Sequence, residues 1–191
     1  MKSLAVMVIA AAATGCAYKA DVLSTSAAYE VSGAQGSRGP AEVVIGESLQ
    51  AVGKEMAPTF ACVGYKYPLA YGQAIRDSIL QTVGGAYSPV ESSPRQPSAP
   101  APYPVFRFDL AEFDPTITFT PGLITTGTAT VEIALRVTVF HSGAALRSFT
   151  ARGTGQAVGD GNCTIGAGLL ASAGQKSLRL ALESFVKQGI N

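Results

Sequence analysis

The 191-residue chain has no tryptophan, a single histidine and few charged side chains. Charged residues make up 14% of the sequence, whereas about a quarter is usual for soluble domains. The 14 basic and 13 acidic residues nearly cancel. A chain without a charge excess lacks the field that attracts nucleic acid or anionic lipid. The composition therefore argues against a nucleic-acid partner.

The sequence also has no apolar run long enough to cross a bilayer as a helix, which takes roughly 20 residues. The longest run at the N-terminus extends from Leu4 to Ala13, and Lys2 precedes it. A short apolar core with a basic start and a small-residue exit is typical of a secretory signal that is removed. We therefore expect residues 1–15 to be a signal peptide.

Signatures of catalysis and metal binding are missing as well. Serine hydrolysis needs a nucleophile, a base and an orienting acid, but the chain has no G-x-S-x-G motif, and His141 is expected in a hairpin turn. There is no C-x-x-C or H-E-x-x-H motif, so the usual metal-ligand spacings are absent. We expect a protein that is not an enzyme and that holds no metal and no cofactor.

Two groups of residues come closest to a site. The carboxylates Asp109, Glu112 and Asp114 are neighbours in sequence, but an extended strand would point Asp109 and Glu112 to opposite faces. That geometry disfavours a paired acid and base. The glycines that begin at Gly153 have the wrong spacing for a dinucleotide-binding loop, and we interpret residues 153–168 as a Gly-rich link.

The residues Ala13-Thr14-Gly15-Cys16 resemble the lipobox of bacterial lipoproteins. In that family the cysteine is lipidated and becomes the new N-terminus, so the resemblance implies a lipid anchor at Cys16. Ala17 stands where an Asp would resemble an inner-membrane retention signal, which favours the periplasmic face of the outer membrane. The alternative is an ordinary signal peptide cut at a nearby small residue.

The chain has three cysteines, and an odd number in an exported protein indicates a leftover thiol. If Cys16 carries lipid, Cys62 and Cys163 remain, and an oxidising periplasm allows them to form a disulfide. The alternative is two separate buried thiols that behave as small apolar side chains.

Hydrophobic periodicity predicts the elements of the body. A short apolar run predicts a strand at 42–45, and a strand-like run follows at 60–63. Helical spacing predicts helices over 70–83 and 169–188, and alternation predicts strands over 106–110, 127–140 and 146–156. Residues 16–41 have few large apolar side chains and are expected to form a flexible tether, and the six prolines of 88–104 predict a surface loop.

This order of elements favours an α+β fold with two layers, an antiparallel sheet and two helices packed on one face. We expect residues 42–191 to form a single periplasmic domain. The strand over 127–140 would leave a polar face, which is either solvated or a contact surface for a protein partner. Its candidate residues are Thr130, Glu132, Arg136 and Thr138.

The order of elements resembles small periplasmic accessory lipoproteins, such as the auxiliary lipoproteins of ABC-type lipid export and the YajG-like lipoproteins. This resemblance implies a non-catalytic accessory or assembly component of an envelope complex. The proline-rich insertion is also similar to lipoproteins of conjugation systems, so the alternative is a structural subunit of a secretion or conjugation apparatus. A periplasmic small-ligand carrier or enzyme is a further alternative.

The substitution Cys16→Ser tests the lipid anchor. Because a hydroxyl cannot replace the acylated thiol, we expect the variant to leave the membrane fraction or to accumulate as an uncleaved precursor. Cell fractionation and intact-mass analysis measure both effects. An unchanged membrane fraction would contradict lipidation at this residue.

Overall fold

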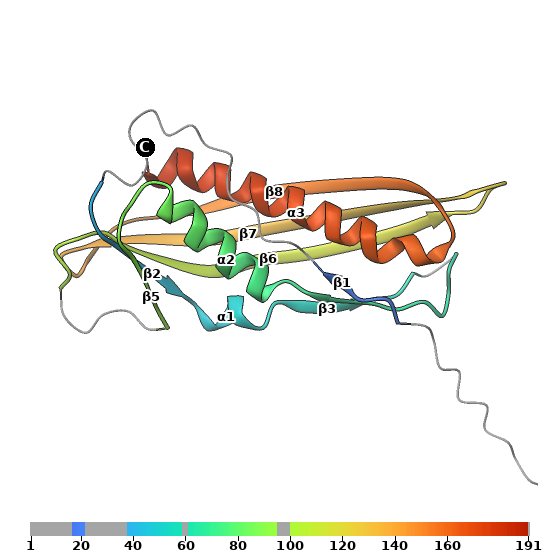
Figure 1. The fold of residues 1–191 in the computed structure, drawn as a ribbon, viewed down its shortest axis with the longest axis horizontal. Coiled ribbons are helices and arrows are strands. Elements are labelled where there is room, and N and C mark those ends of the chain that lie inside the picture. The colour runs from blue at the N-terminus through green and yellow to red at the C-terminus, as the bar shows by residue number, and fades with distance from the viewer. Residues whose placement is uncertain (1–16, 22–37, 59–60, 95–99, 191) are drawn as a thin grey trace, which may run out of the picture.

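The computed structural model describes residues 17–21, 38–58, 61–94 and 100–190. They form an α+β fold with two sheets and helices beside them (Figure 1). The larger sheet has five strands in the order β5-β2-β6-β7-β8. Its strands are β2 (Ala41–Ile45), β5 (Val90–Ser93), β6 (Val105–Thr120), β7 (Thr125–His141) and β8 (Ala144–Gly161).

The smaller sheet has three short strands in the order β1-β4-β3. They are β1 (Ala20–Asp21), β3 (Gly53–Met56) and β4 (Tyr67–Ala70). The helices are α1 (Glu47–Gln50), α2 (Gly72–Gly84) and α3 (Gly166–Phe185). A 3₁₀ turn, Cys163–Ile165, precedes α3, and a π-helical turn, Val186–Ile190, follows it.

The α+β class is confirmed, but the prediction of a single antiparallel sheet was wrong in two respects. The strand β2 pairs in parallel with both β5 and β6, and β1, β3 and β4 form a second sheet. The strand β5 lies inside the 88–104 segment that we interpreted as a loop. Short strands with little alternation carry no period-2 signal, so the sequence pattern does not reveal them.

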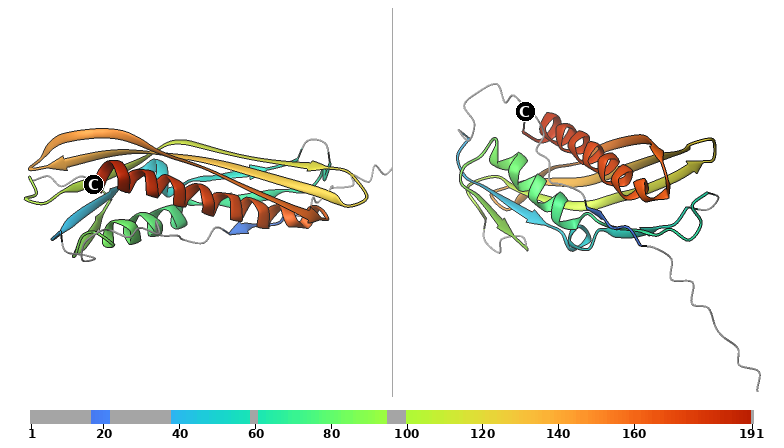
Figure 2. Two further views of the ribbon diagram at one scale, coloured as in Figure 1. Left: turned by 90° about the horizontal axis from the view of Figure 1, so that it is seen from above. Right: turned by 45° about the vertical axis from the view of Figure 1, so that its right-hand side comes forward.

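The predicted long strand and both predicted helices are confirmed. Along β7, Val131, Ile133, Leu135 and Val137 are fully buried. The helices α2 and α3 lie on the same side of the five-stranded sheet (Figures 1 and 2), as expected. The side chains that α2 and α3 bury toward the sheet share helical spacing, and they are Ile75, Ile79 and Val83 on α2 and Leu178, Leu182 and Phe185 on α3.

The helix α3 packs almost backbone to backbone on β8. A Cβ at Gly155 would lie 2.0 Å from the carbonyl oxygen of Ala173, and one at Gly153 would lie 2.0 Å from that of Ser177. The Ser177 hydroxyl donates a hydrogen bond to the Gly153 carbonyl at 2.8 Å. Because only glycine lacks a Cβ, these two positions permit an approach that no other residue allows.

The strand predicted over 146–156 is confirmed, but the interpretation of 153–168 as a link was wrong except for the short connection between β8 and α3. The strand β8 continues to Gly161, and α3 begins at Gly166. Gly153, Gly155 and Gly159 alternate with outward-facing residues, so these positions without a side chain lie on the face under the helix.

The tether also differs from expectation where the structure describes it. Ala17 forms a β-bridge with Lys66, and β1 pairs in parallel with β4. At the other end of the segment, the Arg38 guanidinium donates to the Ile190 carbonyl. Both described ends of the 16–41 segment are thus bonded to the domain, whereas Cys16 and residues 22–37 lie outside the described residues.

The close packing of α3 on β8 predicts that Gly155→Ala destabilises the protein. Overpacking of this kind costs about 1–3 kcal/mol or more. The matched control is Gly168→Ala, because this exposed α3 glycine has nothing within 4 Å of its added Cβ. The control should leave stability unchanged or raise it by up to about 1 kcal/mol. Urea unfolding measures both, and equal midpoints for the two variants would contradict the packing.

Candidate functional site

The three long strands β6, β7 and β8 have one face turned away from the helices, which we call the outer face. The antiparallel register places Thr130 opposite Thr116 and Gln156, and Thr138 opposite Arg107 and Ser148. The outer face comprises the residues that alternate with the core positions, namely Arg107, Asp109, Glu112, Asp114, Thr116, Thr118, Thr128, Thr130, Glu132, Ala134, Arg136, Thr138, Ser148, Thr150, Arg152, Thr154, Gln156 and Val158.

The four residues singled out from the sequence, Thr130, Glu132, Arg136 and Thr138, all lie on this face. They are half-buried except for Arg136, which is exposed. The structure therefore brings them together along a single strand.

A β-bulge corrects the expectation for the carboxylates. The register shifts between Leu110 and Glu112, so that Asp109 lies opposite Arg136 and Glu112 opposite Ala134. Because positions 134 and 136 of β7 share a face, Asp109 and Glu112 share the outer face as well. The prediction that they point to opposite faces was wrong, since one extra residue in β6 reverses the alternation.

An ion network joins the three strands at the middle of the outer face. The Arg152 Nη1 atom lies 2.7 Å from Glu112 Oε2 and 3.2 Å from Glu132 Oε1. The hydrogen bond and charge of Glu112, with a smaller contribution from Glu132, raise the pKa of the Arg152 guanidinium. Ion pairs this exposed to solvent add little stability. They fix charge positions more than they hold the sheet together.

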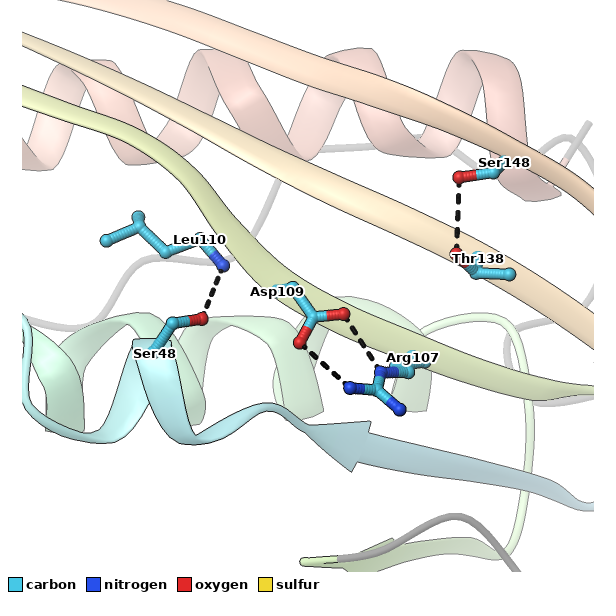
Figure 3. Close-up of polar contacts among 6 residues, drawn as sticks. All are labelled: Ser48, Arg107, Asp109, Leu110, Thr138 and Ser148. Atoms are coloured by element: carbon cyan, nitrogen blue, oxygen red, sulfur yellow. Dashed lines mark hydrogen bonds and ion pairs between the residues drawn. The ribbon is translucent and has the colours of Figure 1, made fainter.

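Further polar contacts follow the same face toward the β2 end (Figure 3). The Arg107 Nε and Asp109 Oδ2 atoms are 2.9 Å apart, and the carboxylate raises the pKa of this guanidinium. The Thr138 and Ser148 hydroxyls lie 3.2 Å apart across β7 and β8.

Arg152 and Arg107 also belong to this surface, although neither was expected there from the sequence. The alternation along the strand indicates the position of Arg152, since its neighbours Ala151 and Gly153 face α3. Continuing the period of two through the glycines would have placed Arg152 on the outer face.

Cys62 and Cys163 are joined by a disulfide, with their Cα atoms 5.5 Å apart. The bridge connects the turn at residues 61–64 to the start of α3. The prediction of a strand at 60–63 was wrong where the structure describes this segment. Ala61 to Gly64 form bends and turns, and Cys62 has a φ of 64°. Phe60 lies outside the described residues, as does Cys16.

Tyr67 packs beside the bridge and ties it to the core. Its hydroxyl donates to the Cys163 carbonyl at 2.5 Å. Burial of the phenol raises the pKa of Tyr67 to about 12, so the hydroxyl keeps its proton at neutral pH. The ring also occupies the space at Gly166, where a Cβ would lie 2.5 Å from its Cζ atom.

The single histidine lies where the sequence placed it. His141 ends β7, is exposed, and is followed by the turn of Ser142 and Gly143. Within the described ranges, no group of three or more His, Cys, Asp or Glu side chains is arranged to hold a metal ion. The helices in this part of the chain are all too short or too polar to span a membrane.

An open hollow lies on the helix side, at the carboxyl ends of β2 and β5 and the start of α2. Its volume is about 480 Å³. Exposed Arg76 is the cation among its lining residues, which are Ile45, Gln50, Gly72, Gln73, Arg76, Ser92, Ser93 and Pro94. Chemically, this set of amide, hydroxyl and guanidinium groups suits a small polar ligand.

Comparison with known proteins gives distant likenesses. No family model and no curated protein matches the chain. A Xanthomonas campestris protein of the DUF330 family model is 15% identical with a TM-score of 0.46, over 90% of this chain and 92% of that one. A minor lipoprotein from Acinetobacter baumannii is 9% identical with a TM-score of 0.37, over 78% and 88%.

A neuraminyllactose-binding hemagglutinin homolog from Helicobacter pylori is 9% identical with a TM-score of 0.46, over 87% of this chain and 92% of that one. Likenesses at this level assign neither a family nor a function to the chain.

The disulfide predicts a marked sensitivity to reductant. Closing a loop of about 100 residues is worth roughly 4.7 kcal/mol in the chain-entropy model. Reduction should therefore lower the urea midpoint of the oxidised protein. The double variant Cys62→Ser/Cys163→Ser is the control, and its midpoint should not respond to reductant. If reductant leaves the oxidised protein's midpoint unchanged, the bridge does not form in solution.

Proposed function

We propose that the protein is a non-catalytic envelope lipoprotein, anchored through Cys16, that acts as an accessory or assembly component of a larger complex. In this proposal the outer face of β6, β7 and β8 binds a protein partner. The anchor lies on the periplasmic face of the outer membrane.

The pairing of cysteines is the observation that carries the proposal. The disulfide uses Cys62 and Cys163, and the sequence holds one further cysteine, Cys16. A structural disulfide fits an oxidising compartment, to which the signal-like residues 1–15 would direct the chain. The leftover thiol then stands at the lipobox position, where acylation would use it.

The character of the outer face supports a protein partner. It is long and turned away from α2 and α3, and it carries both signs of charge in fixed positions, such as the Arg152 network with Glu112 and Glu132. Charges held in place favour selection of a complementary partner and fix its register. The same network contributes little to the stability of the fold, so binding of a partner would explain why these charges are arranged in this way.

A small-ligand carrier is the second candidate, and the hollow at the start of α2 favours it. Its volume of about 480 Å³ lies in the usual range for small-molecule sites, roughly 300–1,000 Å³. Such a carrier would use Arg76 to bind an anionic group of its ligand.

Charge reversals on the outer face test the leading proposal. Glu132→Lys and Arg136→Glu should each abolish a partner crosslinked in cells, because both would oppose the partner's complementary charges. Arg76→Glu on α2, on the opposite side of the sheet, is the matched control and should retain the crosslink. Affinity recovery followed by mass spectrometry measures the crosslinked partner.

The comparison requires that the variants and the parent protein have the same free energy of unfolding. Exposed substitutions usually change the free energy of unfolding by about 0.5 kcal/mol or less, and urea midpoints verify this. Undiminished recovery of the partner with both outer-face variants would remove this face from consideration. Loss of partner recovery with Arg76→Glu alone would favour the hollow.

A further inference from the structure

Three strongly exposed apolar side chains gather at one end of the domain. Leu123 is fully exposed, and Ile124 beside it is 65% exposed, both in the turn between β6 and β7. Val63, in the turn next to the disulfide, is 69% exposed. We call Leu123, Ile124 and Val63 the apolar tip.

The contacts of the chain place these residues at the same end. Thr125, directly after Ile124, pairs with Gly161 at the end of β8. Two residues later Cys163 is bridged to Cys62, the neighbour of Val63. The β6–β7 turn and the segment after residue 60 lie at one end of the long axis in every view (Figures 1 and 2).

The start of the described chain is fixed to this same region. The Tyr18 amide donates to the Lys66 carbonyl at 2.8 Å, and Ala17 forms a β-bridge with Lys66. The Tyr18 ring stacks on Tyr65, with ring centroids 5.7 Å apart. Lys66 is only a few residues after Val63 in the sequence. The bonds at Lys66 therefore hold Ala17 near Val63 in space.

A lipid on Cys16 would consequently be attached directly to the body of the domain. Consecutive Cα atoms are about 3.8 Å apart, so Cys16 stands one such step before Ala17. A lipid there would be one peptide unit away from Ala17, which is bonded to Lys66.

We propose that the apolar tip inserts into the lipid bilayer beside the anchor, as a second membrane contact that sets the orientation of the domain. This inference rests on the lipid anchor of the proposed function. Amphipathic elements at an interface bury their apolar side chains roughly 5–10 Å into the headgroup and acyl boundary, a depth that a projecting turn can reach.

Charges near this end favour neutral lipid contact over attraction to anionic headgroups. Three lysines of the small sheet and its surroundings are paired with carboxylates, in the pairs Lys19–Asp21, Lys54–Asp114 and Lys66–Glu55. These pairs have no net charge, and the exposed Asp160 opposite Thr126 adds a negative charge that disfavours anionic headgroups. The contact would therefore depend on the apolar side chains.

The orientation has a consequence for the outer face. With the apolar tip in the bilayer, β6, β7 and β8 run away from the membrane (Figure 1). Strands of this length reach roughly 55 Å at ~3.3 Å per residue. The outer face would therefore be presented to a partner in the periplasm and not to the bilayer surface.

A single tryptophan reporter tests the insertion, because the chain has none of its own. Leu123→Trp is placed in the full-length, acylated protein reconstituted into phosphatidylcholine vesicles with brominated acyl chains. The matched control is Leu146→Trp, which is 66% exposed near the opposite end of the strands. We expect several-fold stronger quenching and a blue-shifted emission for Leu123→Trp, and Ile124→Trp should repeat this result.

Equal quenching of the two reporters would overturn the inference. A blue shift that needs no lipid and rises with protein concentration would also overturn it, because it would assign the tip to a second copy of the chain.

Intact-mass analysis separates this test from the lipid anchor itself. If Cys16 carries no acyl chain, the proposed function fails, and the Cys16 thiol is instead coupled to maleimide lipid in the same vesicles. Because Cys62 and Cys163 are joined in the disulfide, Cys16 is the reactive thiol of the oxidised protein. Strong quenching of Leu123→Trp in that preparation would support the geometry alone, and weak quenching would overturn it.

Discussion

The contact between α3 and the glycines of β8 is the constraint on which the rest of the domain depends. Gly153 and Gly155 let the helix backbone rest on the strand, and the Ser177 hydroxyl bonds the Gly153 carbonyl there. This fixes the helix along the sheet and with it the 3₁₀ turn before α3, which contains Cys163. The disulfide then holds the turn at Cys62, and Lys66 shortly beyond it holds Ala17. A single close packing thus determines where the N-terminal segment meets the domain.

The two faces of the five-stranded sheet differ in their contribution to stability and in their exposure. The face under α2 and α3 buries the aliphatic row of β7 and supplies the hydrophobic stabilisation. The opposite face carries the ion network of Arg152, which contributes little to stability because solvent reaches all of its members. Substitutions on the outer face can therefore change recognition without unfolding the protein, which is the property that an assembly surface needs.

Strong periodicity predicted the elements that carry most of the core. The strand β7 alternates without a break, and both long helices repeat their apolar residues at three and four positions, so these were found from the sequence. The end of β8 after Gln156 was not, because its glycines have a low strand propensity and no side chain to show alternation. Only the packing of α3 explains why Gly153 and Gly155 suit a strand.

The site shows the same limit of local patterns. The polar positions of β7 were found by alternation, whereas the bulge after Leu110 moved Glu112 to the face of Asp109, and nothing in the neighbouring residues marks such an insertion. The pairing of Cys62 with Cys163 was left open because it depends on tertiary distance. The bonds of Ala17 and Tyr18 and the two-residue strand β1 were missed because segments this short show no periodic pattern.

Hydrogen exchange at the Tyr18 amide tests the central claim most directly, namely that the N-terminal segment is bonded to the chain just after the disulfide turn. The Tyr18 N–H donates to the Lys66 carbonyl, so in the oxidised full-length protein its exchange should be slowed by orders of magnitude relative to an unstructured peptide. Exchange at the unprotected rate would contradict the account, since the anchor would then sit on a free tether.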